Sequence, residues 1–345
     1  MRCSIVPPYL LSRLSGLDDD RLAAVSRAAH HTLLQSRPLV ENRQRPAQRG
    51  SLPITVTTDP NRSIYDADGR ERLPGTLVRK EGAAPTGDPA ADEAYEGLGA
   101  THALFLDVYG RASIDARGLA LDASVHYGRL YDNAFWDGSQ MVFGDGDGEV
   151  FNRFTISLSV IGHELTHGVT QYSSGLDYEG QAGALNESVS DVFGALVEQH
   201  AAGQTATQAS WLIGSELFTD MVEGSALRSM RAPGTAYSDD ILGVDPQPAH
   251  MRDFVVTKDD NGGVHINSGI PNRAFYLVAD ALGGFAWQGA GHIWYDTITG
   301  GRLSKSATFV EFAEATIAAA VARSASGSRE HVAVRQAWQA VGVLS

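Results

Sequence analysis

The stretch His163-Glu-Leu-Thr-His-Gly-Val-Thr-Gln-Tyr-Ser-Ser-Gly-Leu-Asp-Tyr-Glu-Gly-Gln-Ala-Gly-Ala-Leu-Asn-Glu187 decides how the fold and the chemistry of this chain are interpreted. Positions i and i+4 of a helix lie on one face, so His163 and His167 can present two imidazoles to one metal ion. Glu164 projects from the next position round the helix and can reach a water on that metal without being a ligand. The His-Glu-x-x-His pattern is short, so its surroundings must support it.

A third metal ligand lies downstream. Glu187 and Asp191 are again four residues apart, within a second helical pattern. Glu187 can complete a His₂Glu site whose fourth position stays open for water, which is the arrangement of catalytic zinc. Asp191 can accept the outer N–H of a ligating histidine and fix its tautomer. We therefore predict one catalytic Zn²⁺ held by His163, His167 and Glu187.

Other classes of zinc peptidase fit less well. One class needs a third histidine six residues after the second, with a glycine midway, but Ser173 and Thr170 occupy those positions. The Gly-x-Met-x-Asn element of related aminopeptidases is absent, which favours cleavage of internal bonds. In the predicted mechanism zinc polarises the scissile carbonyl and acidifies its water. Glu164 takes the proton from that water and delivers it to the leaving amine.

Three motifs resemble the thermolysin family of zinc metallopeptidases. They are the stretch quoted above, Asp132-Asn-Ala-Phe-Trp-Asp-Gly-Ser-Gln-Met141 and Asp260-Asn-Gly-Gly-Val-His-Ile-Asn-Ser-Gly-Ile270, and the resemblance covers roughly residues 51–345. It implies an α+β fold with two lobes and the zinc helix between them. The expected lobes are a β-rich N-terminal lobe over residues 51–172, which includes the zinc helix, and a mainly α-helical C-terminal lobe over residues 173–345.

The resemblance also implies roles for single residues. His265 resembles the family's transition-state histidine, with Asp260 as its carboxylate partner, and Tyr178 resembles the phenol that donates to the developing oxyanion. The groups expected to hold the substrate are Asn133, the backbone of Ala134, and Arg228; the expected apolar pocket for the residue after the cut bond is lined by Phe151, Val160, Ile213 and Leu227. The implied preference in that pocket is a bulky apolar side chain.

Residues 1–50 form a candidate module of their own. They hold eight arginines and four acidic residues, whereas the whole chain has a net charge of -14. Helical spacing predicts one helix over residues 16–36, and the polar, arginine-rich residues 41–50 form an expected linker that a protease can cut. Ile5-Val-Pro-Pro-Tyr-Leu-Leu11 is similar to the short propeptide of protealysin-like family members. This implies a zymogen whose own propeptide occupies the cleft until it is cut near Arg49 to Ser51.

Cys3 is the single cysteine of the chain and lies in this module. The hypothesis is that its thiolate approaches the zinc in the uncut form and displaces the water. A Cys3→Ser variant with unchanged latency and maturation rate would contradict it. One cysteine cannot form an intramolecular disulfide, so the fold does not depend on an oxidising compartment.

The paired calcium site of the family is not expected here. Glu198 matches one of its acidic ligands, but the other corresponding positions are Ser159, Ser210, Leu212 and Ser215. Calcium needs six to eight oxygen ligands. A double calcium site, and stability that depends on it, are therefore doubtful.

The remaining elements follow from local patterns. Strand and turn signals dominate residues 51–155, with Asp68-Gly69 as a hairpin corner. One helix is expected over residues 92–109. Helical patterns then take over, and the expected ranges are 156–171, 184–202, 264–282 and 308–323.

Charge and composition restrict the partners and the location. A net charge of -14 argues against nucleic acid and anionic membranes, and no apolar run approaches the roughly 20 residues of a membrane helix. The expected partners are protein or peptide substrates, and the expected state is a monomer. Pro7, Pro8 and Arg13 interrupt any apolar core of a secretion signal. We therefore expect a cytoplasmic protein, or one that is exported outside the Sec route.

Two rival functions remain open at this stage. An inactive homologue could keep its propeptide and bind a partner, although the intact Glu164 and the complete ligand set argue against it. A zinc amidase could act on amides that are not peptides. A peptidase assay with and without a zinc chelator distinguishes an active peptidase from the inactive binding protein. Product analysis of a peptide library distinguishes a peptidase from the zinc amidase.

Overall fold

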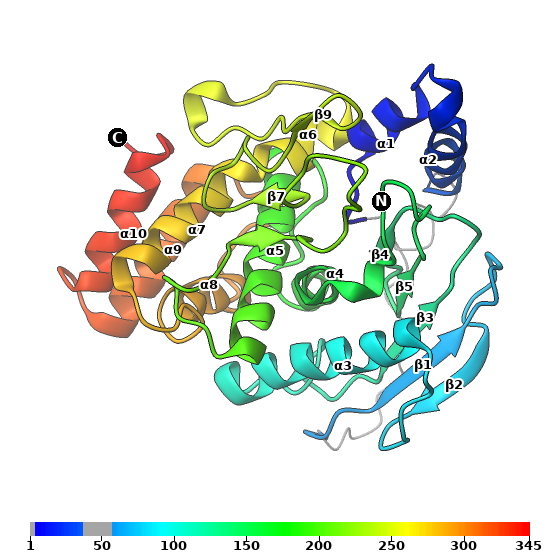
Figure 1. Cartoon of the computed structure of the whole chain (residues 1–345). Helices are drawn as coiled ribbons and strands as arrows, with labels where there is room; N and C mark the ends of the chain where they lie inside the picture. The colour runs from blue at the N-terminus through cyan, green and yellow to red at the C-terminus, as the bar shows by residue number, and fades with distance from the viewer. Residues whose placement is uncertain (1–3, 37–56) are drawn as a thin grey trace.

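The structure is a computed structural model that describes residues 4–36 and 57–345. The predictions for Cys3, for the linker over residues 41–50 and for the cut near Arg49 to Ser51 lie outside the described residues. A small helical N-terminal segment sits beside two lobes, one built on a sheet and one built of helices (Figure 1). The predicted α+β architecture with two lobes is confirmed.

The N-terminal lobe contains a five-stranded sheet in the order β2-β1-β3-β5-β4. The strands are β1 (Arg62–Asp66), β2 (Thr76–Lys80), β3 (Leu121–Val125), β4 (Ala134–Trp136) and β5 (Met141–Phe143). The three central strands run parallel to one another, whereas β2 and β4 are antiparallel to their neighbours. β4 is therefore an edge strand, a position at which another extended segment can pair.

The turn at Asp68-Gly69 lies where the sequence predicts it. Both residues have positive φ, 54° and 67°, which aspartate and glycine tolerate better than most residues. The hairpin is longer than predicted because β2 begins only at Thr76. Beside the sheet, the predicted helix over residues 92–109 consists of α3 (Pro89–Ala103) and a π-helical turn, Leu104–Val108. α3 packs between the sheet and the next helix, α4.

Two buried helices, α4 (Leu158–Gln171) and α5 (Gly180–Ala202), run through the middle of the molecule. They match the predictions for residues 156–171 and 184–202, and α5 begins one turn earlier than expected. Gly162 and Gly194 form the closest contact, since a Cβ on Gly162 would lie 3.0 Å from Gly194 Cα. A Cβ on Gly194 would lie 2.4 Å from the Ser159 carbonyl oxygen. Glycine therefore lets these two helices approach closely enough to share one metal site.

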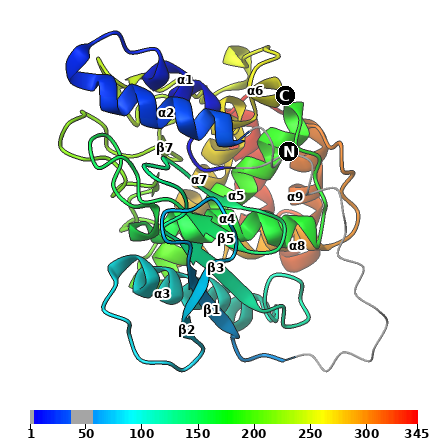
Figure 2. The ribbon, with the colours of Figure 1, turned by 90° about the vertical axis from the view of Figure 1, so that its right-hand side faces the viewer.

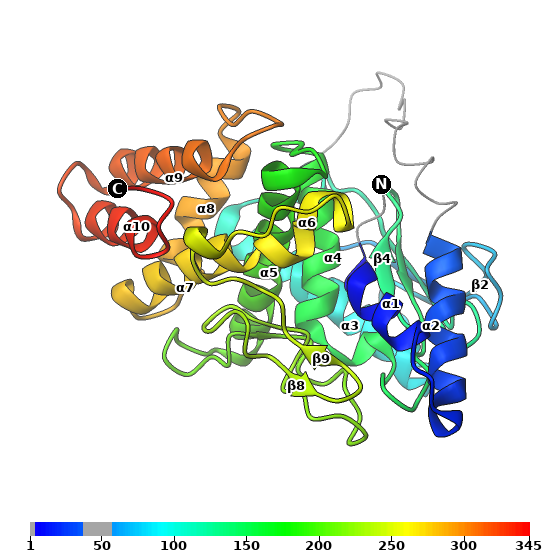
Figure 3. The same cartoon turned by 90° about the horizontal axis from the view of Figure 1, so that it is seen from above.

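The C-terminal lobe is a cluster of helices on the far side of α5 from the sheet (Figure 3). After α5 these are α6 (Asp260–Asn267), α7 (Gly269–Leu282), α8 (Ala290–Thr299), α9 (Phe309–Ser324) and α10 (Arg329–Ala340). The single helix predicted over residues 264–282 is therefore two helices that meet at Ser268. α8 and α10 are not predicted. Their contact is a stack of Trp294 on Trp338, with ring centroids 6.2 Å apart.

The N-terminal segment contains two helices, α1 (Pro8–Ser15) and α2 (Ala23–Ser36), with a 3₁₀ turn at Asp20–Leu22 between them. The prediction of one helix over residues 16–36 is therefore partly wrong, and α1 is missed. Proline is tolerated in the first turn of a helix, so Pro8 starts α1 instead of breaking it. α1 and α2 lie together at the top of the molecule in Figure 2, and the view from above shows them on the side of α4 that is turned away from α5 (Figure 3). Within residues 4–36 and 57–345, no helix has the length and apolar character of a membrane span.

Candidate active site

His163 and His167 are buried on one face of α4, as their spacing predicts. His163 Nδ1 lies 2.7 Å from Asp191 Oδ1, and His167 Nδ1 lies 2.9 Å from Asn186 Oδ1. These oxygens accept the Nδ1–H of each ring, so Nε2 is left as the ligand atom. The two Nε2 atoms are 3.0 Å apart and face the same point.

Glu187 on α5 faces that point from the other side. Its carboxylate oxygens lie 3.5 Å from His163 Nε2 and 3.7 Å from His167 Nε2. The ligand atoms of the three residues lie within 4.8 Å of one another, and no other such group occurs in the described part of the chain. Two nitrogen ligands on a tetrahedral zinc are about 3.3 Å apart. The distances and the two imidazoles with one carboxylate therefore fit zinc.

Asp191 is fully buried and anchors three elements at once. Besides His163 on α4, it accepts hydrogen bonds from Arg228 Nε at 2.9 Å, from Arg228 Nη2 at 2.8 Å and from Asn272 Nδ2 at 2.8 Å. Burial favours the neutral acid, but Arg228 and His163 outweigh it and hold the pKa of Asp191 well below its usual range. An ionised Asp191 therefore fixes His163 and links α5 to the strand that carries Arg228.

Glu164 is fully buried at the junction of the two lobes. Its Oε2 accepts a hydrogen bond of 2.9 Å from the backbone N–H of Trp136 on the edge strand β4. Glu164 follows His163 on α4 but is not part of the three-residue metal group. The bond to a backbone N–H in another element could not be read from local sequence.

His265 and Tyr178 face the same metal site from the C-terminal lobe. His265 Nε2 lies 3.6 Å from Glu187 Oε2 and 3.3 Å from the Tyr178 hydroxyl, and that hydroxyl donates a hydrogen bond to Glu187 Oε1. Burial alone would lower the pKa of His265, but the carboxylates of Asp260 and Glu187 raise it to about 9. These charges favour a His265 ring that donates from Nε2, in keeping with the Ser4 carbonyl oxygen 3.1 Å from that atom.

A left-handed turn places Asp260 against His265. Asn261, Gly262 and Gly263 have φ of 52°, 85° and 75°, and two adjacent glycines make this conformation accessible. The turn brings Asp260 Oδ1 to 2.6 Å from His265 Nδ1, while Asp260 Oδ2 accepts the His265 backbone N–H at 2.8 Å. The Asp-Asn-Gly-Gly motif therefore fixes the ring and directs Nε2 at the site.

The N-terminal segment occupies the cleft as an added strand. Ser4 pairs with Phe135 of β4 in an antiparallel bridge, and the Ile5 N–H donates to the Ala134 carbonyl at 3.2 Å. Asn133 brackets Val6, because Oδ1 accepts the Val6 N–H at 2.9 Å and Nδ2 donates to the Val6 carbonyl at 3.2 Å. The two residues expected to hold a substrate on this strand therefore hold residues 5 and 6 instead.

The carbonyl groups of this segment meet the other expected binding groups. Arg228 Nη1 donates to the Ile5 carbonyl at 3.1 Å, and the Ser4 carbonyl oxygen lies 3.1 Å from His265 Nε2. Every backbone polar group between the Ser4 carbonyl and the Val6 carbonyl thus has a partner in the site. His265 Nε2 thus lies between the Ser4 carbonyl oxygen and Glu187 Oε2, at 3.1 and 3.6 Å.

The four residues expected to line an apolar pocket are buried in one continuous core cluster that also contains Ile5. Phe151 packs on Phe218 with ring centroids 5.6 Å apart. Ile213 pairs with Arg228 across the two-stranded sheet β6 (Leu212–Ile213) and β7 (Arg228–Ser229). The other two members are Val160 and Leu227, which are buried as well. The assignment of these four residues to a pocket around Ile5 stays a prediction.

Several supporting residues are not predicted. Asn186, Ser190 and Asn272 bind His167 or Asp191, and Gln247 Nε2 donates to the His265 carbonyl at 2.8 Å. Asn186 directly precedes Glu187, and this place within the motif was the one feature of the sequence that could have indicated a role for Asn186. Gln247 lies 18 residues before His265 and has no such signal.

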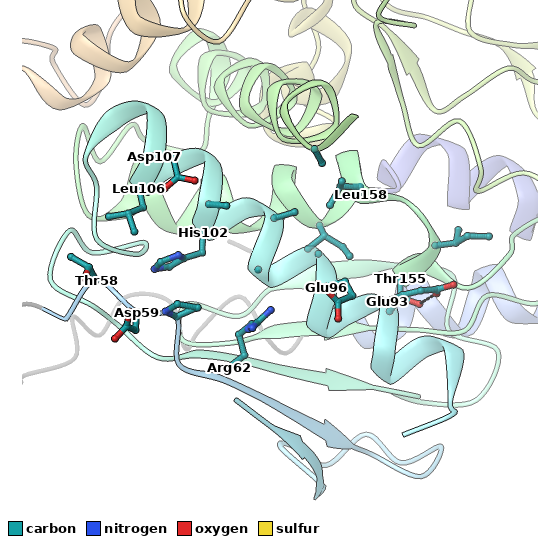
Figure 4. Close-up of a pocket in the computed structure, with 18 residues that line it drawn as sticks. Thr58, Asp59, Arg62, Glu93, Glu96, His102, Leu106, Asp107, Thr155 and Leu158 are labelled. Atoms are coloured by element: carbon teal, nitrogen blue, oxygen red, sulfur yellow. Dashed lines mark hydrogen bonds between the residues drawn. The ribbon is translucent and has the colours of Figure 1, made fainter. Parts of the chain in front are cut away.

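A cavity of about 680 Å³ lies beside α3, away from the metal ligands. Its lining includes His102, Arg62 and Asp59 (Figure 4) and none of the predicted site residues. The metal site is therefore not this cavity but the cleft that residues 4–6 fill.

Sequence profiles of known families match almost the whole chain. "Thermolysin metallopeptidase, catalytic domain" matches residues 47–171, and "Thermolysin metallopeptidase, alpha-helical domain" matches residues 174–343. The chain belongs to the thermolysin family of metallopeptidases. Thermolysins themselves are among its relatives, and one from Bacillus sp. (strain EA1) is 40% identical over 81% of this chain and 51% of its own length.

Two relatives and one solved structure match this chain over nearly their full length. The "Extracellular metalloprotease" of Pectobacterium carotovorum subsp. carotovorum is 52% identical over 99% of this chain and 96% of its own. "Protease PrtS" of Photorhabdus sp. (strain Az29) is 46% identical over 98% of this chain and 91% of its own. The solved structure of the precursor of protealysin, a metalloproteinase from Serratia proteamaculans, superposes with a TM-score of 0.90 at 50% identity and covers 99% of this chain and 100% of that one.

These likenesses confirm the main functional prediction. The thermolysin-family protein is a zinc metalloendopeptidase with a protealysin-like precursor, and it is made as a zymogen. It acts on proteins as substrates. The rival interpretations, an inactive binding protein and a non-peptide amidase, do not fit this family assignment.

The prediction of location is wrong. We expected a cytoplasmic protein, or one exported outside the Sec route, because Pro7, Pro8 and Arg13 interrupt any apolar signal core. Two relatives carry the word extracellular in their names, from Pectobacterium carotovorum and from Serratia marcescens. The interruption of an apolar run by Pro7, Pro8 and Arg13 is thus a poor guide to the location of a protease of this family.

Proposed function

We propose that residues 4–6 lie in the cleft as a peptide substrate would, and that their contacts define how this endopeptidase works. The observation that carries the proposal is the row of hydrogen bonds from the Ser4 carbonyl to the Val6 carbonyl. In this register Ile5 stands for the residue after the cut bond. Ser4–Ile5 stands for the scissile bond, and Arg228, Asn133 and the Ala134 carbonyl bind the leaving side of the substrate.

Glu164 acts as general base and then as general acid. Zinc, when held by His163, His167 and Glu187, polarises the scissile carbonyl and lowers the pKa of a water molecule. Glu164 is held beside these ligands by the Trp136 N–H, where its carboxylate accepts the proton of the attacking water. It then passes that proton to the leaving nitrogen. General acid–base catalysis of this kind contributes about 10²- to 10⁴-fold to the rate.

His265 and Tyr178 stabilise the oxyanion that forms on the scissile carbonyl. The Ser4 carbonyl, which stands for that group, lies 3.1 Å from His265 Nε2. Asp260 and Glu187 keep His265 protonated, with a pKa of about 9 although burial opposes this. A charged donor strengthens as negative charge develops on its acceptor, so it favours the transition state over the substrate. Tyr178 supplies a second donor once its hydroxyl turns from Glu187 towards the substrate.

The apolar residues around Ile5 set the preference for the residue after the cut bond. Phe151, Val160, Ile213 and Leu227 are at most 2% exposed, so a polar side chain there would lose its hydration without a partner. Burying a Leu or Phe side chain contributes about 1.5–3 kcal/mol. We expect the processed enzyme to cut about 10- to 100-fold faster before Leu, Ile or Phe than before Ser or Asp.

A peptide library with product mass analysis tests this preference. The expected products begin with a bulky apolar residue. Ile213→Ala should weaken the preference for the larger side chains, while an Asp280→Asn control on the exposed side of α7 should not change it. Products whose first residues follow the composition of the library would contradict the assignment of the pocket.

Three segments with separate tasks are proposed: an inhibitory propeptide over residues 1–50, which acts in cis, and lobes over residues 51–172 and 173–345. The profiles support the last boundary, since one ends at residue 171 and the next begins at residue 174. The buried Leu10, Leu11 and Leu14 of α1 support an inhibitory role, because they fix residues 4–6 in the cleft. The proposed role of Cys3 as a zinc ligand of the latent form stays a prediction.

We propose that the double calcium site of the family is missing. Ser159 Oγ accepts the Gly214 N–H at 3.1 Å and lies 3.1 Å from Ser157 Oγ, and Ser210 Oγ accepts the Leu212 N–H at 3.2 Å. Burial, and then the Glu216 carboxylate, raise the pKa of Glu198 to about 7. Glu198 is the only carboxylate among the five positions that correspond to the family's calcium ligands.

Calcium should therefore leave the melting temperature unchanged. A site filled at 100 times its Kd would add about 2.7 kcal/mol of stability. We expect a shift of less than about 1 °C when millimolar calcium is added to the metal-loaded Glu164→Gln precursor, which cannot digest itself. A rise of several degrees that Glu198→Gln abolishes would show that a calcium site remains.

We further propose that the enzyme acts outside the cell as a monomer, in keeping with its relatives that are named extracellular. The net charge of -14 supports the absence of nucleic acid and anionic membranes among its partners. Light scattering of the precursor should give a single species near the chain mass of 36.8 kDa, and a larger mass would contradict the monomer.

A further inference from the structure

Asp132 is a buried acid directly before Asn133, the residue that brackets Val6. Its side chain is 0% exposed, and neither carboxylate oxygen has a hydrogen-bond partner of ordinary geometry. Asp147 supplies a third such atom, since its Oδ2 is also buried without a partner. An ionised carboxylate in this environment would be strongly unfavourable. The arrangement therefore demands a proton or another charge between the two side chains.

Two backbone bonds hold this acid against the loop that contains Asp147. The Gly144 N–H donates to the Asn133 carbonyl at 2.9 Å, and the Gly146 N–H donates to the Tyr131 carbonyl at 3.3 Å. These bonds flank Asp132 on both sides. Asp147 is itself fixed, because its Oδ1 accepts the N–H groups of residues 149, 150 and 151 at 2.8 to 3.0 Å. The loop over residues 144–151 is thus a rigid backing for the strand that carries Asn133.

The charges around Asp132 favour its neutral form. Burial first, and then the negative charge of Asp147, raise the pKa of Asp132 to about 9, although the Asp147 backbone N–H acts in the opposite direction. No other charged side chain contributes to this shift. From α2 the neutral hydroxyl of Thr32 accepts the Asp132 backbone N–H at 3.0 Å. The N-terminal segment thus contacts the backbone of Asp132, and the one charge that acts on its carboxyl group is that of Asp147.

We propose that Asp132 and Asp147 form a carboxylic acid–carboxylate pair that shares one proton, and that this pair is the positioning device for Asn133. Asp132 donates the shared proton to the Oδ2 of Asp147. The pair joins the loop over residues 144–151 to the strand that carries Asn133. This contact holds the Asn133 amide where it can bind the backbone N–H and the backbone carbonyl of the substrate residue that takes the place of Val6. The inference rests on the proposed binding role of Asn133.

The pH dependence of stability distinguishes a protonated Asp132 from an ionised one. An aspartate in an unfolded chain titrates near pH 4, whereas the folded pKa of Asp132 is about 9. The folded state therefore holds the proton more tightly. Its stability falls as the pH rises from about 4 to about 9 and is independent of this group above that range. Asn at position 132 can still donate to Asp147 and has nothing to titrate.

Melting curves of the Glu164→Gln precursor, which stays uncut, provide the first test. Adding Asp132→Asn should raise the Tm, and the gain should grow between pH 5 and pH 9 to at least about 3 °C. Both proteins contain the same other acidic residues, so the effects of those residues on Tm cancel when the two Tm values are subtracted. Parallel curves for the two proteins would overturn the shared proton. So would a calcium-dependent rise of the parent Tm that Asp132→Asn removes, since a cation would then balance the pair.

Steady-state kinetics of the processed enzyme provide the second test. Asp132→Ala should raise KM at least about fivefold with kcat within about twofold, because a binding contact shared by substrate and transition state is lost. Asp132→Asn should recover most of that loss, and the Asp280→Asn control on α7 should not change KM. Equal losses in the Ala and Asn variants, or a loss in kcat alone, would overturn the positioning role.

A third variant separates this inference from the function it rests on. Asn133→Ala should raise KM at least as much as Asp132→Ala. An unchanged KM in Asn133→Ala would refute the proposed binding role of Asn133, while the melting curves would still decide whether Asp132 carries a proton. A raised KM in Asn133→Ala with no change in Asp132→Ala would refute the positioning role alone.

Discussion

A Glu164→Gln variant of the processed enzyme should lose at least about 100-fold, and up to about 10⁴-fold, in kcat. The amide keeps the shape of the side chain and can still contact the Trp136 backbone, but it cannot accept the proton of the attacking water. Zinc binding should persist, because Glu164 is not one of the three ligands. The measurement is the turnover of an internally quenched peptide, together with the zinc content of the same samples.

Glu314→Gln is the matched control for this variant. Glu314 lies on the exposed side of α9, so the same chemical change there should leave turnover unchanged. Wild-type turnover in Glu164→Gln would refute the general base. Loss of turnover together with loss of zinc would point to damage of the metal site instead.

An Ile5→Asp change in the precursor should open the cleft. Ile5 is 0% exposed, so an aspartate there would bring an unpaired charge into the apolar pocket, at a cost of several kcal/mol. Residues 4–6 should then leave the site. We expect the uncut Glu164→Gln precursor to bind a fluorescent peptide hydroxamate, which competes for the cleft, at least about 100-fold more tightly when Ile5→Asp is added.

Ile5→Val serves as the control for that experiment, because removal of one buried methyl group costs only about 0.5–1.5 kcal/mol. Its effect on hydroxamate affinity should stay within about tenfold. Equal affinity of the Ile5→Asp precursor and its parent would contradict the proposal that residues 4–6 block the cleft. An equally large gain in Ile5→Val would contradict the role of the apolar pocket.

The metal ligands were predictable because their geometry is local. His163 and His167 are one helical turn apart, and Glu187 lies on the next helix with a recognisable spacing. The partners of Asp191 were less accessible. Its contact with His163 follows from zinc chemistry, but Arg228 and Asn272 are 37 and 81 residues away. No periodic pattern connects positions so far apart, so only the folded chain brings them together.

The helices that the sequence missed have comparable explanations. α1 begins at Pro8 after Pro7, and proline was interpreted as an interruption although it is accepted at the first position of a helix. α8 and α10 depend on the long-range stack of Trp294 on Trp338. The helix predicted over residues 264–282 is instead two helices that meet at Ser268, and the Asp-Asn-Gly-Gly turn at the start of the first one places Asp260 against His265.

The substrate-like register of the N-terminal segment needed the structure. The sequence suggested that a propeptide occupies the cleft, but it did not say which peptide bond would face the metal. Pairing of Ser4 with the edge strand β4 and the bonds of Arg228 to Ile5 fix that register. They also explain how an inhibitory segment can satisfy the same backbone partners as a substrate.

We propose that one zinc ion, held by His163, His167 and Glu187, makes this cleft a peptidase. The most direct test is a zinc titration of the chelator-treated, processed enzyme with a quenched peptide as substrate. We predict no cleavage without metal, followed by a linear rise in rate that levels off at one zinc per chain, with His167→Ala inactive at the same zinc concentrations. Full activity in the chelated enzyme, or wild-type activity of His167→Ala at one zinc per chain, would contradict the account.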